Sequence, residues 1–199
     1  MSDQAQTSLL RPAMSTHTCP WWLGYLLITP LRRLKENPAK ILAPYVREGM
    51  LVLEPGPAMG YFTLELARRV GVSGRVVAVD LQERMLASLR RRAKRAGVAA
   101  RIETRLCRTD DLGIDDLAGR VDFVMLFHML HEVSDPRGFL RALLAALRPD
   151  GTLLFVEPRG HVSPAAFQTS VDLATALGFQ IAEKAVGRKL RVLLRRPGN

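Results

Sequence analysis

Cysteine is scarce in this chain of 199 residues, which has only two, Cys19 and Cys107. Two cysteines cannot build a disulfide framework or a cage of thiolates around a metal ion, and they are typical of a protein kept in a reducing cytoplasm. Long apolar runs are also missing. The best candidate, Pro20–Leu31, falls far short of the about 20 residues that a membrane-spanning helix needs, and it lacks the basic lead and small-residue cleavage site of a secretion signal. We therefore expect a cytoplasmic protein with no transmembrane segment.

Lysine is scarce as well, although the chain is strongly basic. Five lysines and 24 arginines against 19 acidic residues give a formal net charge of +10. Such a charge permits binding of nucleic acid or another anionic partner. However, no basic stretch alternates with aromatic residues for base stacking, and the richest one, Arg90–Gly97, fits the solvated face of a helix. The charge alone therefore does not predict a nucleic-acid-binding protein.

From Met50 onward, apolar runs typical of buried strands alternate with runs typical of helices. The expected strands are 50–54, 75–80, 101–106, 121–126, 151–157, 178–184 and 188–195. The expected helices are 38–47, 60–70, 82–96, 136–148 and 163–177. This alternation predicts right-handed crossovers and a parallel sheet covered on both faces, whereas the last two strands follow one another directly. We expect an α/β protein with a Rossmann-like, doubly wound, mostly parallel seven-stranded sheet that ends in an antiparallel hairpin strand.

The beginning of the chain stands apart from this alternation. Residues 1–18 are polar and aperiodic, and the aromatic and apolar patch CPWWLGYLLITPL follows them. The total length leaves room for one substantial domain. We expect an N-terminal extension over residues 1–45 and a single folded domain over residues 46–199.

A turn with almost no side chains follows the first expected strand, within the sequence LVLEPGPAMGYFTLELA. Gly56 and Gly60 can adopt backbone angles closed to other residues, and Ala58 keeps the surface low, so a ligand can approach the backbone. Thr63 is expected to satisfy a free N–H group at the start of the next helix. Asp80 ends the second expected strand, where a carboxylate can accept hydrogen bonds from both hydroxyls of a ribose. These features predict an adenosine-type ligand at the carboxyl ends of the strands.

Glu54 distinguishes between two classes of such ligands. A dinucleotide places its pyrophosphate at a turn of the form G-x-G-x-x-G with no acid before it. Here the spacing is G-x-A-x-G, and Glu54 stands two residues ahead of the first glycine. An anion at that position would repel a pyrophosphate but attract an ammonium or a sulfonium. We therefore expect a cationic adenosyl compound, which disfavours a nucleotide-dependent reductase.

Four stretches, in this order, resemble the motifs of class I S-adenosylmethionine-dependent methyltransferases: VLEPGPAMGYFTLELA, VVAVD, VDFVMLFHMLHEV and LRPDGTLLFVEP. The resemblance runs from about Lys40 to Asn199. It is closest to the small-molecule branch typified by ubiquinone/menaquinone-biosynthesis methyltransferases. It implies a Rossmann-like fold, S-adenosyl-L-methionine as the cofactor, and transfer of a methyl group to a small molecule.

The same resemblance assigns cofactor-binding residues. It implies Glu54, Gly56, Ala58 and Gly60 around the methionine end, Asp80 and Leu81 at the ribose and adenine, and Phe127 and His128 on the reactive side. The family's adenine-contacting acid after the third strand is replaced here by Arg108. Either backbone groups of Cys107, Arg108 and Thr109 serve instead, or the loop is shifted toward the two aspartates that follow.

His128 and His131, in FHMLHEV, are the candidate catalytic bases. Methyl transfer from a sulfonium is an in-line displacement that needs alignment and no metal, and it needs a base only where the nucleophile carries a proton. Histidine suits that role near neutral pH, although either side chain could instead cap a helix or bond to the backbone. The spacing H-x-x-H-E is not the H-E-x-x-H of zinc proteases, and no third ligand is evident, so we expect no metal. His161, after the fifth strand, is a weaker candidate for substrate binding.

The N-terminal patch acquires a role through the resemblance, because in this family the segment before the first strand commonly covers the cofactor pocket. Trp21, Trp22 and Tyr25 would then contact the substrate. Alternatively they pack on the edge of the sheet or touch a membrane surface. We expect a methyltransferase that acts on a small, partly apolar acceptor. The alternative is a non-catalytic protein of this fold that binds RNA or a protein partner through its basic surface, and no pattern in the sequence indicates an oligomeric state.

Overall fold

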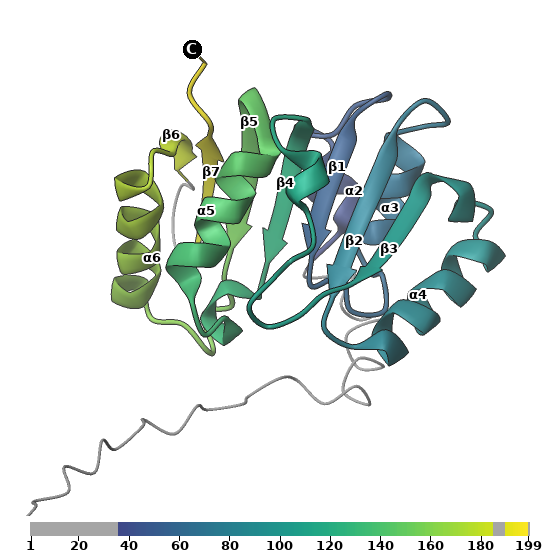
Figure 1. Ribbon diagram of the computed structural model, residues 1–199, viewed down its shortest axis with the longest axis horizontal. Coiled ribbons are helices and arrows are strands. Elements are labelled where there is room, and N and C mark those ends of the chain that lie inside the picture. Colours follow the sequence, from purple (N-terminus) through teal and green to yellow (C-terminus); the bar gives the residue numbers. More distant parts are fainter. Residues whose placement is uncertain (1–35, 185–189, 199) are drawn as a thin grey trace, which may run out of the picture.

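The computed structural model describes residues 36–184 and 190–198, and over these residues seven strands form one sheet with helices on both sides (Figure 1). The strands are β1 (Leu51–Pro55), β2 (Arg75–Asp80), β3 (Ile102–Leu106), β4 (Val121–Phe127), β5 (Leu147–Val156), β6 (Gln180–Lys184) and β7 (Arg191–Arg195). The helices are α2 (Pro38–Leu42), α3 (Thr63–Arg69), α4 (Glu83–Arg95), α5 (Pro136–Ala146) and α6 (Pro164–Ala176). Short 3₁₀ turns are η2 (Ala99–Arg101), η3 (Asp115–Leu117) and η4 (Leu130–Glu132).

The strands lie in the order β3-β2-β1-β4-β5-β7-β6. All neighbours from β3 to β5 pair in parallel, whereas β7 runs antiparallel to both β5 and β6. The expected fold class is therefore confirmed, including the single reversed strand at the end of the chain. The sheet order changes direction beside β1, and such a switch point is where open α/β sheets bind ligands.

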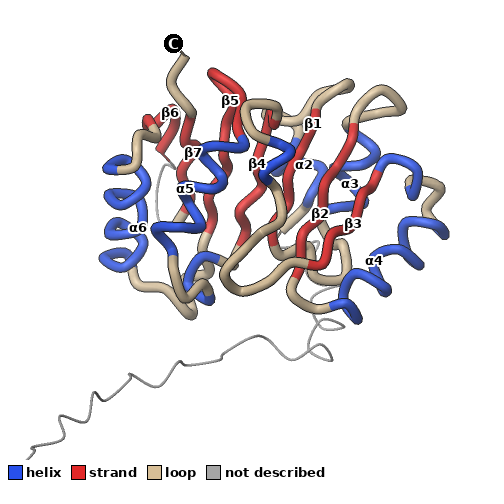
Figure 2. Tube along the Cα trace, viewed as in Figure 1, coloured by secondary structure: helices blue, strands red, loops and turns tan. Residues whose placement is uncertain are grey.

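In Figure 2 the strands form one continuous sheet with helices on both sides. A layer of buried side chains on each face of the sheet packs these helices against it. Alternate residues of a strand point to opposite faces, so Leu53 and Val52 of β1 belong to different layers. The first layer packs α5 and α6 through residues such as Leu140 and Phe167. The second packs α2 and α3 through residues such as Leu42 and Leu66.

Several expected elements differ from those observed. The helix expected over 60–70 spans only Thr63–Arg69, and the helix expected over 136–148 ends at Ala146, directly before β5. The first helix ends at Leu42 rather than Arg47, because Pro44 has no N–H to continue the helical ladder, and the chain goes on in turns closed by Tyr45 and Val46. The fifth strand begins at Leu147 rather than residue 151, because Leu147 already pairs with β4 ahead of a bulge. Among the helices that the structure describes, none is long and apolar enough to cross a membrane.

Candidate functional site

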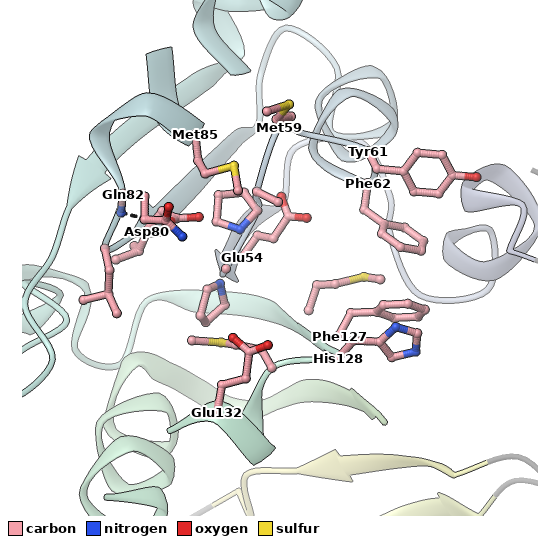
Figure 3. A pocket seen from close by; sticks show the side chains of 18 of the residues that line it. Glu54, Met59, Tyr61, Phe62, Asp80, Gln82, Met85, Phe127, His128 and Glu132 are labelled. Carbon is pink, nitrogen blue, oxygen red and sulfur yellow. Dashed lines mark hydrogen bonds between the residues drawn. The ribbon is translucent and has the colours of Figure 1, made fainter. Parts of the chain in front are cut away.

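A pocket of about 320 Å³ opens at the carboxyl ends of β1, β2, β4 and β5. It brings together most of the residues predicted from the sequence: Glu54, Gly56, Ala58, Asp80, Leu81, Cys107, Phe127, His128, His131 and His161. In Figure 3, Asp80 and Met85 lie on one side of the pocket, Phe62 and Phe127 on the other, and Glu54 between them. The pocket thus joins a carboxylate side, where a ribose is expected, to an aromatic side.

The turn after β1 is shaped by two glycines that have different roles. Gly56 has a φ of +68° and donates its N–H to Val79 O at 2.8 Å, and a Cβ at this position would come within 3.1 Å of Met129 Cγ in the pocket wall. Gly60 has a φ of +83° and lies outside the pocket lining. A Cβ there would lie 2.3 Å from Leu89 Cδ1 of α4. Gly56 therefore keeps the pocket open, whereas Gly60 lets α4 pack against the turn.

Glu54 is the most unusual group in the pocket, because one oxygen of its carboxyl is buried without a hydrogen-bond partner. The residue is 4 % exposed, and its Oε2 has no hydrogen-bond partner. Burial raises the pKa of Glu54 to about 7; the nearby Thr63 hydroxyl opposes this effect and the charge on Asp80 adds to it. Thr63 was expected to cap α3, but its own Oγ1 is buried without a partner. A buried acid that lacks a partner fits a cationic ligand group.

Asp80 ends β2 at the ribose side of the pocket. Its Oδ1 accepts the N–H of Gln82 at 2.9 Å, the contact drawn as a dashed line in Figure 3. Burial raises the pKa of Asp80 to about 6, although backbone N–H groups of Gln82 and Ala58 oppose this effect. Leu81, which follows it, is 39 % exposed and presents an apolar side chain to the pocket.

The loop after β3 contributes less than the sequence suggested. Cys107 lines the pocket, and burial, together with the charge on Asp80, raises the pKa of its thiol to about 11. Arg108 and Thr109 are not among the lining residues. The Arg108 side chain is 78 % exposed and pairs with Asp110 through an Nε–Oδ1 distance of 3.0 Å. A binding role for Arg108 and Thr109 therefore stays a prediction that rests on the resemblance.

The aromatic side is built where α3 and β4 meet. The rings of Phe62 and Phe127 have centroids 4.4 Å apart, and those of Phe127 and His128 are 4.1 Å apart. His128 has a φ of +56°, which is uncommon outside glycine, and its N–H donates to Val156 O of β5 at 2.8 Å. Its Nε2 lies 3.5 Å from Glu36 Oε1. His128 is thus fixed at the end of β4 with its ring against the aromatic wall.

His131, on η4, has a different environment. Its Nδ1 lies 2.7 Å from Oε2 of Glu157, a buried acid that follows β5. The backbone N–H of His131 donates to Oε1 of the same carboxylate at 3.1 Å. The His161 ring lies edge-on to the His131 ring at 5.9 Å, and His161 itself is exposed. The two candidate bases are therefore held by different carboxylates.

Several lining residues were not predicted from the sequence. They are Pro55, Pro57, Met59, Tyr61, Phe62, Val79, Gln82, Met85, Leu112, Met125, Met129, Glu132 and Pro158. Tyr61 and Phe62 directly follow the glycine turn, so their proximity could have been read from the motif. Three further predictions, Trp21, Trp22 and Tyr25, lie outside the residues that the structure describes. Within the described ranges, no group of three His, Cys, Asp or Glu side chains could hold a metal ion.

These features fit S-adenosylmethionine. The unpartnered Glu54 oxygen matches an ammonium group, Asp80 can receive ribose hydroxyls, and Gly56 leaves room against Met129. When bound, this cofactor supplies a methyl group on a sulfonium sulfur. Fold and pocket together define the class as an S-adenosylmethionine-dependent methyltransferase.

Comparison with known proteins places the chain in that class. The family described as "Methyltransferase domain" matches residues 53–155, and the chain belongs to this family. The ubiquinone/menaquinone biosynthesis C-methyltransferase UbiE of Idiomarina loihiensis is 31 % identical over 112 residues, which are 56 % of this chain and 44 % of that protein. The matched region thus spans less than half the length of this relative. The membership of a methyltransferase family that the sequence predicted is therefore confirmed.

Solved structures agree on the fold. A SAM-dependent methyltransferase from Aquifex aeolicus superimposes with a TM-score of 0.78 at 22 % identity, over 89 % of this chain and 98 % of that one. An O-methyltransferase from Thermotoga maritima gives a TM-score of 0.65 at 18 % identity, over 87 % and 72 % of the two chains. At these identities the likeness concerns the fold alone.

Proposed function

We propose that the chain transfers a methyl group from S-adenosylmethionine to a small, partly apolar acceptor. The observation that carries the proposal is the buried Oε2 of Glu54, which has no hydrogen-bond partner, in a residue that lines the pocket together with Gly56 and Ala58. An ionised carboxylate there would hold the ammonium of the cofactor, and Asp80 would hold its ribose. Neither group would suit a pyrophosphate.

The acceptor would approach the methyl group along the aromatic side of the pocket. Tyr61, Phe62 and Phe127 lie on that side (Figure 3), and an apolar acceptor would gain from burial against them. The name of the UbiE relative, which refers to ubiquinone and menaquinone biosynthesis, supports an acceptor with an apolar ring. Polar groups of the acceptor would contact the pocket histidines His128, His131 and His161. The low cysteine content supports a cytoplasmic location.

Calorimetric titration with S-adenosylhomocysteine, beside NADH and NADPH, tests the cofactor site. We expect S-adenosylhomocysteine to bind and the two dinucleotides, NADH and NADPH, not to bind. Methyl transfer is then measured from methyl-labelled S-adenosylmethionine to 1,4-dihydroxynaphthalene, an apolar aromatic diol, as the first acceptor probe. Binding of a dinucleotide instead would refute the role of Glu54. Salt-dependent retention of RNA without binding of S-adenosylhomocysteine would support a non-catalytic protein.

A further inference from the structure

Glu157 is a buried acid that the methyl displacement itself does not need. It is 4 % exposed, and its backbone N–H donates to Leu190 O at 2.9 Å, which fixes the chain just past β5. Both carboxylate oxygens contact His131. Oε1 accepts the backbone N–H of His131, and Oε2 lies against its ring Nδ1.

This arrangement determines which ring nitrogen of His131 carries the proton. A backbone N–H can only donate, so Oε1 must act as an acceptor. Burial raises the pKa of Glu157, whereas His131 and the backbone N–H groups of His131 and Leu130 lower it. A carboxylate that accepts several N–H bonds is stabilised in its charged form. A charged Glu157 accepts a proton-bearing Nδ1, which leaves Nε2 of the neutral imidazole without a proton.

His128 is arranged for the opposite role. Its Nε2 lies 3.5 Å from Glu36 Oε1, and a neighbouring carboxylate favours a proton on that nitrogen. Its ring also packs on Phe127. A histidine whose Nε2 faces an acid is suited to donate a hydrogen bond rather than to accept a proton. The Nε2 of His131 also has an acid nearby, but Glu132 Oε1 is 3.9 Å away, beyond hydrogen-bond distance, whereas Nδ1 lies 2.7 Å from Glu157 Oε2.

We propose that Glu157 is a positioning residue that holds His131 with Nδ1 protonated, so that Nε2 of His131 takes the proton from an acceptor bearing a weakly acidic hydroxyl, such as a phenol. This inference rests on the proposed function, since it assigns roles within the same pocket. The O–H bond of the acceptor breaks and its proton moves to Nε2. The electron pair freed on the acceptor forms the bond to the methyl carbon, while the pair of the methyl–sulfur bond stays with sulfur.

The substitution Glu157→Gln separates this role from packing. The two side chains have nearly the same shape, and the amide oxygen of glutamine must take the place of Oε1, because only an oxygen can accept the His131 N–H. The NH₂ group then faces Nδ1 as a donor and drives the ring proton to Nε2. The loss of activity caused by a wrong histidine tautomer is established for the Asp-to-Asn change in serine proteases.

Nitrogen-15 NMR of the imidazole rings tests the tautomer without any ligand. The chain has four histidines, so His131→Gln assigns the signals. We expect wild-type His131 to carry its proton on Nδ1 and the Glu157→Gln variant to carry it on Nε2. The matched control Asp172→Asn removes an exposed acid on α6. Among the described hydrogen bonds its carboxylate accepts only the one that the Gln168 amide donates, so the variant should keep the wild-type pattern. A wild-type signal with the proton on Nε2 would overturn the proposal, even if the variant did not fold.

A chromogenic phenol tests the proton transfer. With S-adenosylhomocysteine present, 4-nitrophenol is added below its own pKa, and the yellow phenolate is followed. At about one pH unit below that pKa, where roughly a tenth of the phenol is ionised in buffer, we expect wild type and Asp172→Asn to raise the phenolate fraction several-fold and Glu157→Gln to abolish the increase. An equal spectrum in wild type and Glu157→Gln would overturn the role of His131. Failure of the proposed function is distinguishable, because it would appear as absent binding of S-adenosylhomocysteine with the His131 tautomer unchanged.

Discussion

Glu54 and Asp80 end neighbouring parallel strands, and burial together with the charge on Asp80 raises the pKa of Glu54 to about 7. Glu54 pairs in register with Ala78, and Asp80 follows Ala78 by two residues, so the two acids lie on the same face of the sheet on adjacent strands. Two carboxyls so placed are unfavourable in the protein without a ligand. A bound cation and a bound ribose would compensate both carboxyls. Part of the free energy of binding would then come from relieving a cost that lowers the stability of the ligand-free protein.

Replacing Glu54 with glutamine should stabilise the protein at alkaline pH. The pKa of Glu54 is raised on folding from an ordinary 4.5 to about 7, so the folded state disfavours the charged form. The loss of stability begins as the pH rises above 4.5 and is complete above about 7. We expect Glu54→Gln to increase the free energy of unfolding by about 1 to 3 kcal/mol at pH 8 and to have little effect at pH 4. Urea unfolding at the two pH values measures this, and a variant that is less stable at pH 8 would contradict it.

Cofactor affinity should depend on pH through the same group. An ammonium needs the ionised form of Glu54, so the proton must leave before the ligand binds. We expect the association constant of S-adenosylhomocysteine to rise by up to about tenfold per pH unit below pH 7 and to level off above it. Calorimetry from pH 5.5 to 8 measures the slope. Glu54→Gln should bind weakly with a shallower slope, and a wild-type affinity independent of pH would exclude Glu54 as the ammonium site.

Asp80 and Asp110 provide a matched pair for the ribose contact. Asp80 lines the pocket, whereas Asp110 pairs with exposed Arg108 outside it. Because hydrogen bonds to a charged group contribute about 1.5 to 3 kcal/mol, we expect Asp80→Asn to weaken binding of S-adenosylhomocysteine about 10- to 100-fold. Asp110→Asn should bind like the wild type. Equal losses in both variants would mean that the loop after β3 contacts the cofactor as strongly as β2 does.

The sequence predicted the sheet and many of the residues that line the pocket, because both depend on local patterns. Continuous apolar runs separated by helices give parallel strands, and Glu54 and Asp80 stand directly at two strand ends. The position of β7 between β5 and β6 was not foreseen, since strand order depends on long-range pairing. The contact between His131 and Glu157 was missed for the same reason, because it joins residues 26 positions apart.

The role of Gly60 illustrates a further limit of the motif. The sequence assigned Gly60 to the ligand, together with Gly56, since both belong to one small-residue turn. The structure leaves Gly60 outside the pocket lining and places Leu89 of α4, which is fully buried, where a Cβ would lie, so the ligand role of Gly60 stays a prediction. The sequence does not distinguish a glycine that packing requires from a glycine that a ligand requires. The neighbours of each glycine in the structure are needed to tell the two apart.

Gly60→Ala and Gly97→Ala should therefore destabilise the protein to different extents. Both glycines have positive φ values, +83° and +69°, and an alanine in this region loses about 1 to 2 kcal/mol. A Cβ at Gly97 meets nothing within 4 Å, whereas one at Gly60 would overlap Leu89 Cδ1. Overpacking of a core adds about 1 to 3 kcal/mol, so Gly60→Ala should lower the free energy of unfolding by that much more than Gly97→Ala. Urea unfolding of Gly60→Ala and Gly97→Ala measures this difference. Adding Leu89→Ala and the double variant Gly60→Ala/Leu89→Ala gives the coupling between positions 60 and 89. Equal losses of unfolding free energy in Gly60→Ala and Gly97→Ala would show that Leu89 moves aside at no cost. Packing of α4 would then not require a glycine at position 60.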